Sequence, residues 1–514
     1  FLSSQSSFQN VVLTLALAAP EPGYKALAAR VMLRWKQIHG EEEAYLARLI
    51  RRRSDNDKEI AKLAGQLADL RRDLSWLANQ PETDADLLRK KLGELETREI
   101  QLSRLSREFN RHLQVRDVNL DDLQSRLSAG DSALLEMRQY RPFNFKTRQS
   151  GARRWIAMLL PSSDDFSLHD LGPVTETEQH WKQLRNQATP EAAAVLYDNL
   201  FGKLDEKLKN YDTLYIAPDG LLNQVSFARL ITPDGNYWVE RQQLRQVMSG
   251  RHLIPSDEDD LEKPRGILAL GGIDYGTVGT APSVPIAIPT DQTAGMEVAL
   301  RAVSLQIGSF SPLAATEAEA RNVVQRYQDD HQTEPRLWLG KEASEGRLKS
   351  LRTPPAVLHL ATHGFYLSET DSLIDRPMVQ SGLALANANL ALANSPAADS
   401  EDGILYALEA QNLNLEGTQL VVLSACDTGR GTLDYSEGVY GLTRAFRIAG
   451  ARNVLMALWQ VDDAATAEFM RRFYSIWLNS NQPIDPAIAL RKTQLSFLKF
   501  AKPQLRDPRY WAPF

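Results

Sequence analysis

Two short apolar runs constrain the fold of this chain more than any other feature. The run AVLHLATHG ends at His363 and Gly364, and the run TQLVVLSACDTGRG carries Cys426. Each run is short, rich in leucine and β-branched residues, and bounded by turn formers, which is typical of a strand buried on both faces of a parallel sheet. Because sites in open α/β sheets form at the carboxyl ends of the strands, we expect His363 and Cys426 at that edge.

His363 and Cys426 are the pair of residues best suited to covalent chemistry. A thiol becomes a useful nucleophile when a nearby base lowers its pKa, and an imidazole can then protonate the leaving amine. Gly364 lets the backbone approach a scissile carbonyl, so the N–H groups of Gly364 and Cys426 are candidates for an oxyanion hole. The alternative is a small buried thiol beside a core histidine, and the spacing alone leaves both interpretations open.

Other chemistries find little support. His359 and His363 would lie about 13 Å apart on one strand, too far to share a metal ion, and the run has no glutamate of an HExxH motif. Ser424 does not stand in a GxSxG turn. The segment GGIDYG at 271–276 is not GxGxxG, and WLGKEAS lacks the first glycine of a phosphate-binding loop. We therefore expect no metal and no cofactor.

The composition narrows the class of protein. The 59 Lys and Arg residues stand against 65 Asp and Glu, and this charge of −6 gives no general attraction to nucleic acid or acidic membranes. A single cysteine excludes an intrachain disulfide and fits a cytoplasmic location. The apolar run at 11–19 is too short to cross a bilayer and follows no basic residue, so we expect neither an anchor nor a secretion signal. Since the chain begins with Phe1, we expect it to be a fragment of a longer protein.

A length of 514 residues suggests two or three domains. Residues 1–131 place Leu and Ile at helical spacing between charges, which predicts long antiparallel helices. They form either a plain bundle or a regulatory arm, and the periodicity does not choose. Residues 132–258 alternate strands and helices, so we expect a non-catalytic α/β domain. An acidic linker then leads to residues 264–514, the predicted catalytic domain.

Within these domains, short motifs predict particular elements. The expected strands include RWIAMLL, TLYIAP, GILALGG, RLWLG and GLALA, and the expected helices span 175–188, 190–209, 316–328, 343–352, 463–479 and 485–500. The segment at 387–403 is rich in Ala, Asn and Ser, so we expect it to be mobile and a candidate lid or activation loop.

Four segments carry a resemblance to a known family. LHLATHGFY, LVVLSACDTGRG, EGVYGLTRAFRIAGARNVLMALWQVDDAAT and YWAPF resemble the CHAT family of caspase-like cysteine peptidases, which are related to separase and usually joined to tetratricopeptide-type helices. The resemblance covers roughly 132 to 514 and implies an α/β caspase-like fold, with a parallel or mixed sheet flanked by helices and preceded by an α-helical bundle. It also implies a Cys–His dyad in which Cys426 is the nucleophile and His363 the acid and base. The amides of Gly364 and Cys426 would hold the oxyanion. The family pattern leads us to expect a few further residues after YWAPF.

Acidic residues near the strand ends are the candidates for substrate binding. Metacaspases carry an acid two residues before the cysteine, where this chain has Ser424. Separase resembles this chain at WQVDD, so Asp463, with Asp462 in reserve, is our candidate to pair with Arg or Lys at P1. Asp427 is a further candidate. The alternative for Asp462 and Asp463 is that one of them caps the following helix.

The resemblance therefore implies a cysteine endopeptidase with a protein substrate. We expect a regulatory protein partner that acts through the helical arm, and we expect no membrane or nucleic-acid partner. The alternative is a catalytically silent caspase-like scaffold that binds partner proteins.

Overall fold

The computed structural model describes most of the chain from residue 120 onward and the two helices at its start. The described ranges are 2–19, 21–35, isolated positions between 62 and 101, 120–127, 131–163, 165–254, 264–276, 309–330, 335–366, 381–393, 401–427, 435–459, 461–478 and 484–514. Within them, the backbone but not the side chain is described for a few residues, among them Cys426, Asp427 and Asp463.

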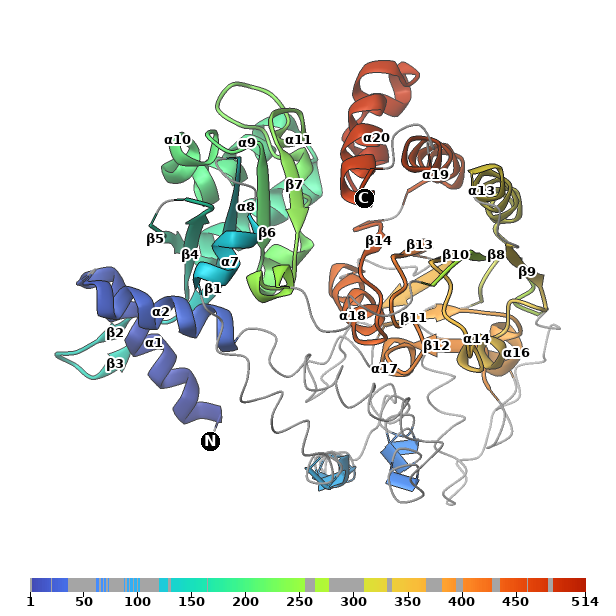
Figure 1. Cartoon of the computed structure of the whole chain (residues 1–514), viewed down its shortest axis with the longest axis horizontal. Coiled ribbons are helices and arrows are strands. Elements are labelled where there is room, and N and C mark those ends of the chain that lie inside the picture. The colour runs from blue at the N-terminus through green and yellow to red at the C-terminus, as the bar shows by residue number, and fades with distance from the viewer. Residues whose placement is uncertain are drawn as a thin grey trace. The chain divides into compact units, whose positions relative to one another are not determined.

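The chain divides into two compact units, coloured along the sequence in Figure 1. Unit 1 comprises residues 1–38, 114–259 and 490–501, and unit 2 comprises residues 39–113, 260–489 and 502–514. Each unit has its own mixed sheet.

The sheet of unit 1 has five strands in the order β5-β4-β1-β6-β7. Strands β5, β4 and β1 are antiparallel neighbours, whereas β1, β6 and β7 run parallel. Their bounds are β1 (Ser132–Tyr140), β4 (Arg154–Pro161), β5 (Ser167–Pro173), β6 (Thr213–Ala217) and β7 (Gln243–Gln246), and a separate hairpin pairs β2 (Phe143–Asn144) with β3 (Gln149–Ser150).

Helices cover both faces of this sheet because β1 is apolar on both sides. Leu134 packs in a cluster with residues of α1 (Leu2–Ala18), α2 (Pro22–Trp35) and α7 (Leu120–Arg126). Its neighbour Leu135 points to the opposite face, since successive side chains of a strand alternate, and packs with α8 (Val174–Gln187) and α9 (Pro190–Phe201). The first two helices of the chain are therefore part of the core of unit 1.

Among its described residues, unit 1 contains further α-helical segments. They are α10 (Asp205–Leu208), α11 (Trp238–Arg241) and the part of α20 (Pro486–Phe500) that begins at Leu490. Arg491 of α20 donates to the carbonyls of Val239, at 2.8 Å, and Glu240, at 3.0 Å. These bonds fasten α20 to α11, which contains Val239 and Glu240.

The sheet of unit 2 has seven strands and is parallel through its middle. Strands β9-β8-β10-β13-β14 are parallel neighbours, and β11 and β12 add antiparallel pairs beside the carboxyl end of β10. Their bounds are β8 (Ile267–Ile273), β9 (Arg336–Gly340), β10 (Val357–Tyr366), β11 (Ser381–Ala384), β12 (Ile404–Tyr406), β13 (Leu420–Asp427) and β14 (Val454–Met456).

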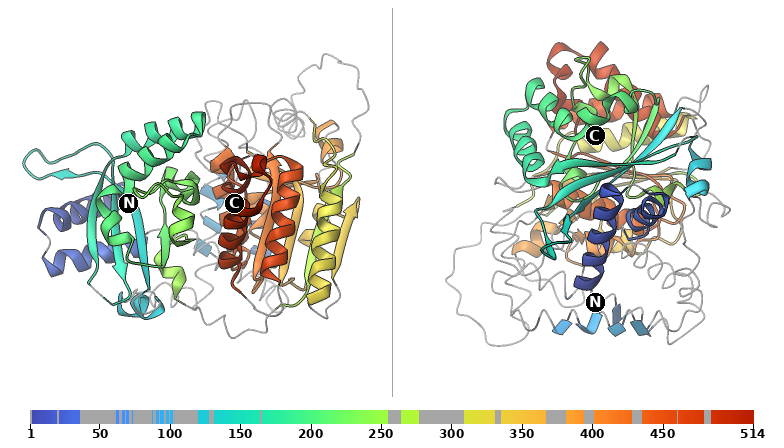
Figure 2. Two further views of the ribbon diagram at one scale, coloured as in Figure 1. Left: turned by 90° about the horizontal axis from the view of Figure 1, so that it is seen from above. Right: turned by 90° about the vertical axis from the view of Figure 1, so that its left-hand side faces the viewer.

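Helices flank the sheet of unit 2 on both faces, as Figure 1 shows. One face carries α13 (Thr316–Asp330) and α19 (Asp463–Trp477), which run over the strands in the left view of Figure 2. The other face carries α14 (Glu345–Lys349), α17 (Ala407–Ala410) and α18 (Tyr435–Ile448). The remaining helices are α16 (Ala388–Ala393) and α21 (Pro508–Trp511).

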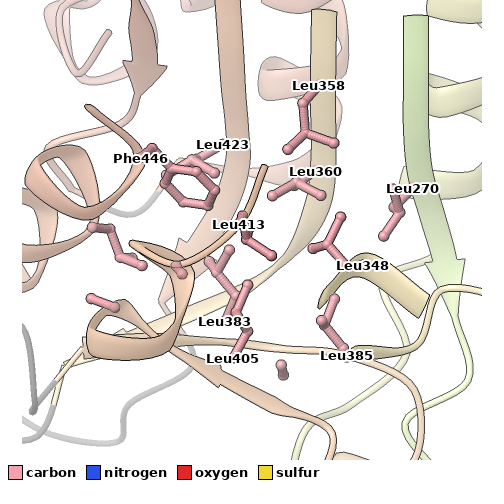
Figure 3. Packing of buried hydrophobic residues seen from close by; sticks show 14 of the residues in the cluster. Leu270, Leu348, Leu358, Leu360, Leu383, Leu385, Leu405, Leu413, Leu423 and Phe446 are labelled. Carbon is pink, nitrogen blue, oxygen red and sulfur yellow. The ribbon is translucent and has the colours of Figure 1, made fainter. Parts of the chain in front are cut away.

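The main core of unit 2 lies between the sheet and α14, α17 and α18. Figure 3 shows leucines of three strands gathered there with side chains from the helices: Leu270, Leu358, Leu360, Leu423, Leu348 and Phe446. All six are fully buried. Burying one such side chain contributes about 1.5–3 kcal/mol, so this cluster fixes the strands that end at the candidate site.

A glycine lets α13 begin close to β8. A Cβ atom on Gly271 would lie 2.3 Å from the carbonyl oxygen of Thr316, the first residue of the helix. A larger residue would therefore push α13 away from the sheet.

Most of the expected strands are confirmed, but several helix bounds were wrong. The segment expected as a helix at 190–209 ends its α-helix at Phe201 and continues through a 3-10 turn into α10. The helix expected at 343–352 is the shorter α14. Within the supposedly mobile segment 387–403, residues 388–393 form α16, while residues 394–400 lie outside the described residues.

The predicted bundle over residues 1–131 is not confirmed. α1 and α2 pack on the sheet of unit 1 rather than forming a separate arm, and most of residues 36–119 lie outside the described part of the chain.

Candidate active site

His363 and Cys426, which were predicted to meet at the edge of the sheet, lie on adjacent strands in the structure. β10 and β13 are parallel and hydrogen-bonded, and their register pairs His363 with Cys426. Adjacent strands lie about 4.8 Å apart, so the two backbones meet at the same level of the sheet. The apolar residues that precede each of them, Leu360 and Leu423, are also paired and lie in the common core.

The imidazole of His363 is fully buried and is held by three neighbours. Its Nε2 atom lies 2.6 Å from the carbonyl oxygen of Ser311. The ring of Phe310 stacks on it at 5.6 Å between centroids, with 28° between the planes, and the ring of Tyr275 lies 5.1 Å away. Tyr275 in turn is anchored by its hydroxyl, 3.0 Å from Oγ1 of Thr362.

The contact with Ser311 determines the tautomer of His363. A carbonyl oxygen can only accept a hydrogen bond, so Nε2 carries the proton that is donated to it. In the neutral imidazole, Nδ1 is therefore the basic nitrogen.

Gly364 lies inside β10 rather than in the turn after it, because the strand continues to Tyr366. Its register partners are Leu383 of β11 on one side and Asp427 of β13 on the other. The backbone next to His363 is thus fixed from two directions.

The sequence profile of the CHAT domain matches residues 190–514, well over half of the chain. The chain belongs to the CHAT domain family. CHAT domains are caspase-like, and the resemblance inferred from the HG and SAC segments is confirmed. The matched region begins within unit 1, later than the start at 132 that the motifs suggested, and continues through unit 2.

Two curated relatives are called tetratricopeptide repeat protein 28. The mouse protein is 43% identical over 76 residues, which are 15% of this chain, and the human protein is 29% identical over 159 residues, which are 27% of this chain. The aligned segments cover only 3% and 6% of the length of those relatives. The names agree with the predicted association of the CHAT domain with tetratricopeptide-type helices.

Of the three candidate acids for substrate binding, Asp462 has a described side chain. It is the N-cap of α19, and its Oδ1 atom accepts from the backbone N–H groups of Ala464, at 3.1 Å, and Ala465, at 3.2 Å. The capping alternative therefore applies to Asp462. Asp463 is the first residue of α19, and Asp427 is the last residue of β13. The side chains of both lie outside the described part of the CHAT domain.

His359, the other histidine of β10, has a different environment. It is fully buried, with Nδ1 3.1 Å from the hydroxyl of Tyr474 on α19 and Nε2 3.0 Å from Oε1 of Glu319 on α13. Burial, together with the charge of Glu319, raises the pKa of Tyr474 well above its usual value. This group ties two helices of the CHAT domain to the middle of the sheet.

Among the described residues, one group of acids brings its oxygens close enough to hold a cation. It consists of Glu345, Glu401 and Glu409. The ammonium of Lys349 lies 2.5–2.8 Å from an oxygen of each, so a fixed positive charge already fills the space between them.

Sequence reasoning missed the residues that hold the His363 ring. Tyr275 stands in GGIDYG, a segment tested only for nucleotide binding, and Phe310 with Ser311 follows a stretch of little periodicity. An aromatic residue beside turn formers is a weak signal, and it gains meaning only when the sheet brings both segments to His363.

Within the described ranges, no helix combines the length and the apolar character that crossing a membrane requires.

Proposed function

We propose that this CHAT domain is a cysteine endopeptidase that cleaves a protein substrate with Cys426 and His363. The observation that carries the proposal is the register of β10 and β13, which pairs the only cysteine of the chain with a histidine whose Nε2 is bound to a carbonyl. Membership of a caspase-like family supports it. The single cysteine also supports a cytoplasmic location.

In the proposed reaction, Nδ1 of His363 takes the proton of the Cys426 thiol. The thiolate attacks the carbonyl carbon of the peptide bond, and the N–H groups of Gly364 and Cys426 stabilise the negative charge on its oxygen. The C–N bond then breaks as Nδ1 returns the proton to the leaving amine. Water hydrolyses the remaining thioester and releases the free thiol.

Alanine substitutions of the two residues test this function directly. Cys426→Ala and His363→Ala should each lower cleavage by at least about 10³-fold, because the two groups act as a unit. Ser424→Ala and His180→Ala are the matched controls, since one is a neighbour in the same strand and the other is a histidine of unit 1. The assay is mass spectrometry of new N-termini in a proteome treated with each variant. Cleavage that survives in Cys426→Ala would contradict the proposal.

A basic P1 residue is the proposed substrate preference, with Asp463 as the residue that binds it. The capping bonds of Asp462 support this choice between the two neighbours, because a carboxylate engaged at a helix N-terminus is less available to a guanidinium. Profiling with a peptide library tests the preference. Cleavage after Asp or apolar residues, with no preference for Arg or Lys, would refute it.

We also propose that a partner protein activates the peptidase. The names of the relatives support a tetratricopeptide-type protein-binding region in proteins of this kind. Full activity of the isolated chain on its natural target, without any partner, would contradict activation of this type.

The second candidate function is a scaffold that binds proteins through a catalytically silent CHAT domain. It agrees equally well with the family assignment. Cys426→Ala separates the two, because it abolishes cleavage in a peptidase and leaves the binding function of a scaffold intact.

A further inference from the structure

Asn389, near the start of α16, makes a set of hydrogen bonds to remote parts of the backbone. It lies in the segment 387–403, whose Ala-, Asn- and Ser-rich sequence does not predict such bonds. Its side chain is 4% exposed. Oδ1 accepts from the backbone N–H of Phe310 at 2.8 Å, and Nδ2 donates to the carbonyl of Phe310 at 2.9 Å and to that of Gly276 at 3.0 Å. One amide group thus clamps the backbone of Phe310 on both sides and joins it to a second segment.

The backbone around Asn389 strengthens the same connection. Its own N–H donates to the carbonyl of Tyr275 at 2.8 Å, and the N–H of Asn387 donates to that of Asp274 at 3.0 Å. The first turn of α16 is therefore fastened to residues 274–276 and to Phe310 at once.

These two segments carry the three groups that hold the catalytic candidate His363. The carbonyl of Ser311, one residue after Phe310, accepts the hydrogen bond from Nε2. The rings of Phe310 and Tyr275 flank the imidazole. Phe310 and Tyr275 are themselves hydrogen-bonded to Asn389 through their backbones, and Ser311 is the residue next to Phe310.

Two kinds of contact among the described residues hold this backbone: the buried ring of Phe310, which packs against His363 and Phe365, and a small set of hydrogen bonds. The hydrogen bonds that reach the backbone of residues 309–311 come from Asn389 and from His363 itself. Ser311 as a residue is exposed to solvent, although its carbonyl faces the buried imidazole. The clamp at Phe310 thus acts on the residue that precedes the carbonyl bound to His363.

We propose that Asn389 is a positioning residue for His363, which acts by fixing the Phe310–Ser311 backbone. The inference rests on the proposed function of the Cys426–His363 pair. Asn389 binds the backbone of Tyr275, Gly276 and Phe310 and would act on His363 through them, so its loss should displace the proton-transfer group and lower kcat while KM stays nearly constant. A small displacement of a catalytic group can cost up to about 10²-fold in rate, and we expect a loss of that order for Asn389→Leu.

The single cysteine allows a test that needs no known substrate. Alkylation of the full chain by iodoacetamide reports on Cys426 alone, and its rate against pH follows the thiolate. The profile of the wild type should lie below the pH near 8.5 that is typical of a free cysteine. In Asn389→Leu it should move toward that value, with alkylation near pH 7 slowed by about three- to tenfold.

The ring nitrogens of His363 give a second readout. Nitrogen NMR of protein with labelled histidine distinguishes the two neutral tautomers, and His363→Gln identifies the resonances among the eight histidines. The wild type should be the Nε2–H tautomer, and Asn389→Leu a mixture. Should the leucine variant fail to fold, Asn389→Asp decides by the same readouts, because it keeps the side-chain shape and the acceptor for Phe310 but loses both donated bonds.

Thr418→Val is the matched control. Thr418 is fully buried in unit 2 and donates to the carbonyl of Pro355 at 2.8 Å, but it lies before β13, at the opposite edge of the sheet from Cys426. It should lower stability without changing the alkylation profile or the tautomer. A folded Asn389 variant with a wild-type tautomer and profile would overturn the inference alone. An alkylation profile unchanged by His363→Gln would instead overturn the proposed dyad.

Discussion

The removal of Lys349 should destabilise unit 2 to an extent that depends strongly on pH. Its ammonium lies 2.5 Å from Glu345, 2.6 Å from Glu401 and 2.8 Å from Glu409. The side chains of Glu345 and Glu409 are only 2% and 11% exposed, so Lys349→Met leaves buried carboxylates without their cation. Breaking a buried pair in this way costs about 3–5 kcal/mol.

Protonation of the acids limits this cost. Burial, with the charges of Asp402 and Glu409, already raises the pKa of Glu345 well above 4.5, and burial raises the pKa of Asp402 to about 7. A group whose folded-state pKa is raised contributes stability below its unfolded pKa and loses it as the pH rises. Since one pH unit corresponds to about 1.4 kcal/mol, protonating Glu345 costs at most about 5 kcal/mol at pH 8 and about 1.4 kcal/mol at pH 5.5.

Native-state hydrogen exchange on the peptide that carries β12 measures the loss of stability beside Glu345. This peptide lies next to the acids because the N–H of Gly403 donates to Oε2 of Glu345 at 3.0 Å. We expect Lys349→Met to lose about 3–5 kcal/mol at pH 8 and about 1 kcal/mol at pH 5.5. Adding Glu345→Gln, which keeps an acceptor for Gly403, should restore most of the loss at pH 8. The exposed ion pair of Arg321 is the control, and Arg321→Met should cost under about 1 kcal/mol at either pH. An equal loss at both pH values, or no recovery in the double variant, would refute the reasoning.

Two further predictions concern a helix cap and the core of unit 1. Asp462→Ala should lower the stability of unit 2 by about 1 kcal/mol, and Asp462→Asn by less, because asparagine still caps a helix. Neither variant should change the P1 preference. If Asp462→Asn lost cleavage after basic residues, Asp462 rather than Asp463 would be the residue that binds P1. Arg241→Leu should destabilise unit 1 by about 3 kcal/mol, measured by urea unfolding. The reason is that Arg241 donates to Asp205 at 2.8 Å and to the hydroxyl of Tyr197 at 2.6 Å in a nearly buried group. A loss under about 1 kcal/mol would show that water replaces the guanidinium there.

The strands that carry the site were predictable because their apolar content is local. β10 begins with the residues VLHLA and β13 with LVVL, and such largely apolar runs fit a strand buried on both faces. Their adjacency follows from the general architecture of parallel sheets, and the register now confirms it. The catalytic roles of His363 and Cys426 stay proposals.

The edge strand β5 of unit 1 was not predicted, since its residues are half polar. Asp170 in β5 accepts from Arg154 of β4 at 2.8 Å and from the hydroxyl of Tyr140 of β1 at 3.0 Å. Burial raises the pKa of Asp170, but the hydrogen bonds from Arg154, the N–H of Gly172 and Tyr140 outweigh it and hold the pKa below its usual value. Polar contacts between strands stabilise this edge of the sheet, and a search for apolar patterns in the sequence does not detect them.

α16 shows how tertiary contacts override composition. The Ala- and Asn-rich segment predicted mobility, yet Asn389 finds three backbone partners in segments that are remote in sequence. An asparagine in a polar stretch gives no sign of such partners before the fold is known. The same limit explains why the sequence could not identify the groups that orient His363.

The two histidines of β10 show what distinguishes a site from a core. Both are fully buried, and they lie on the same strand four residues apart. The two nitrogens of His359 face side chains from two packed helices, so the ring is held in a fixed structural group. His363 is bound instead to a carbonyl on an exposed residue at the carboxyl edge, next to Cys426 in register. Burial and residue type are equal for the two, so it is the position along the strand, relative to the sheet edge, that makes His363 the candidate for proton transfer.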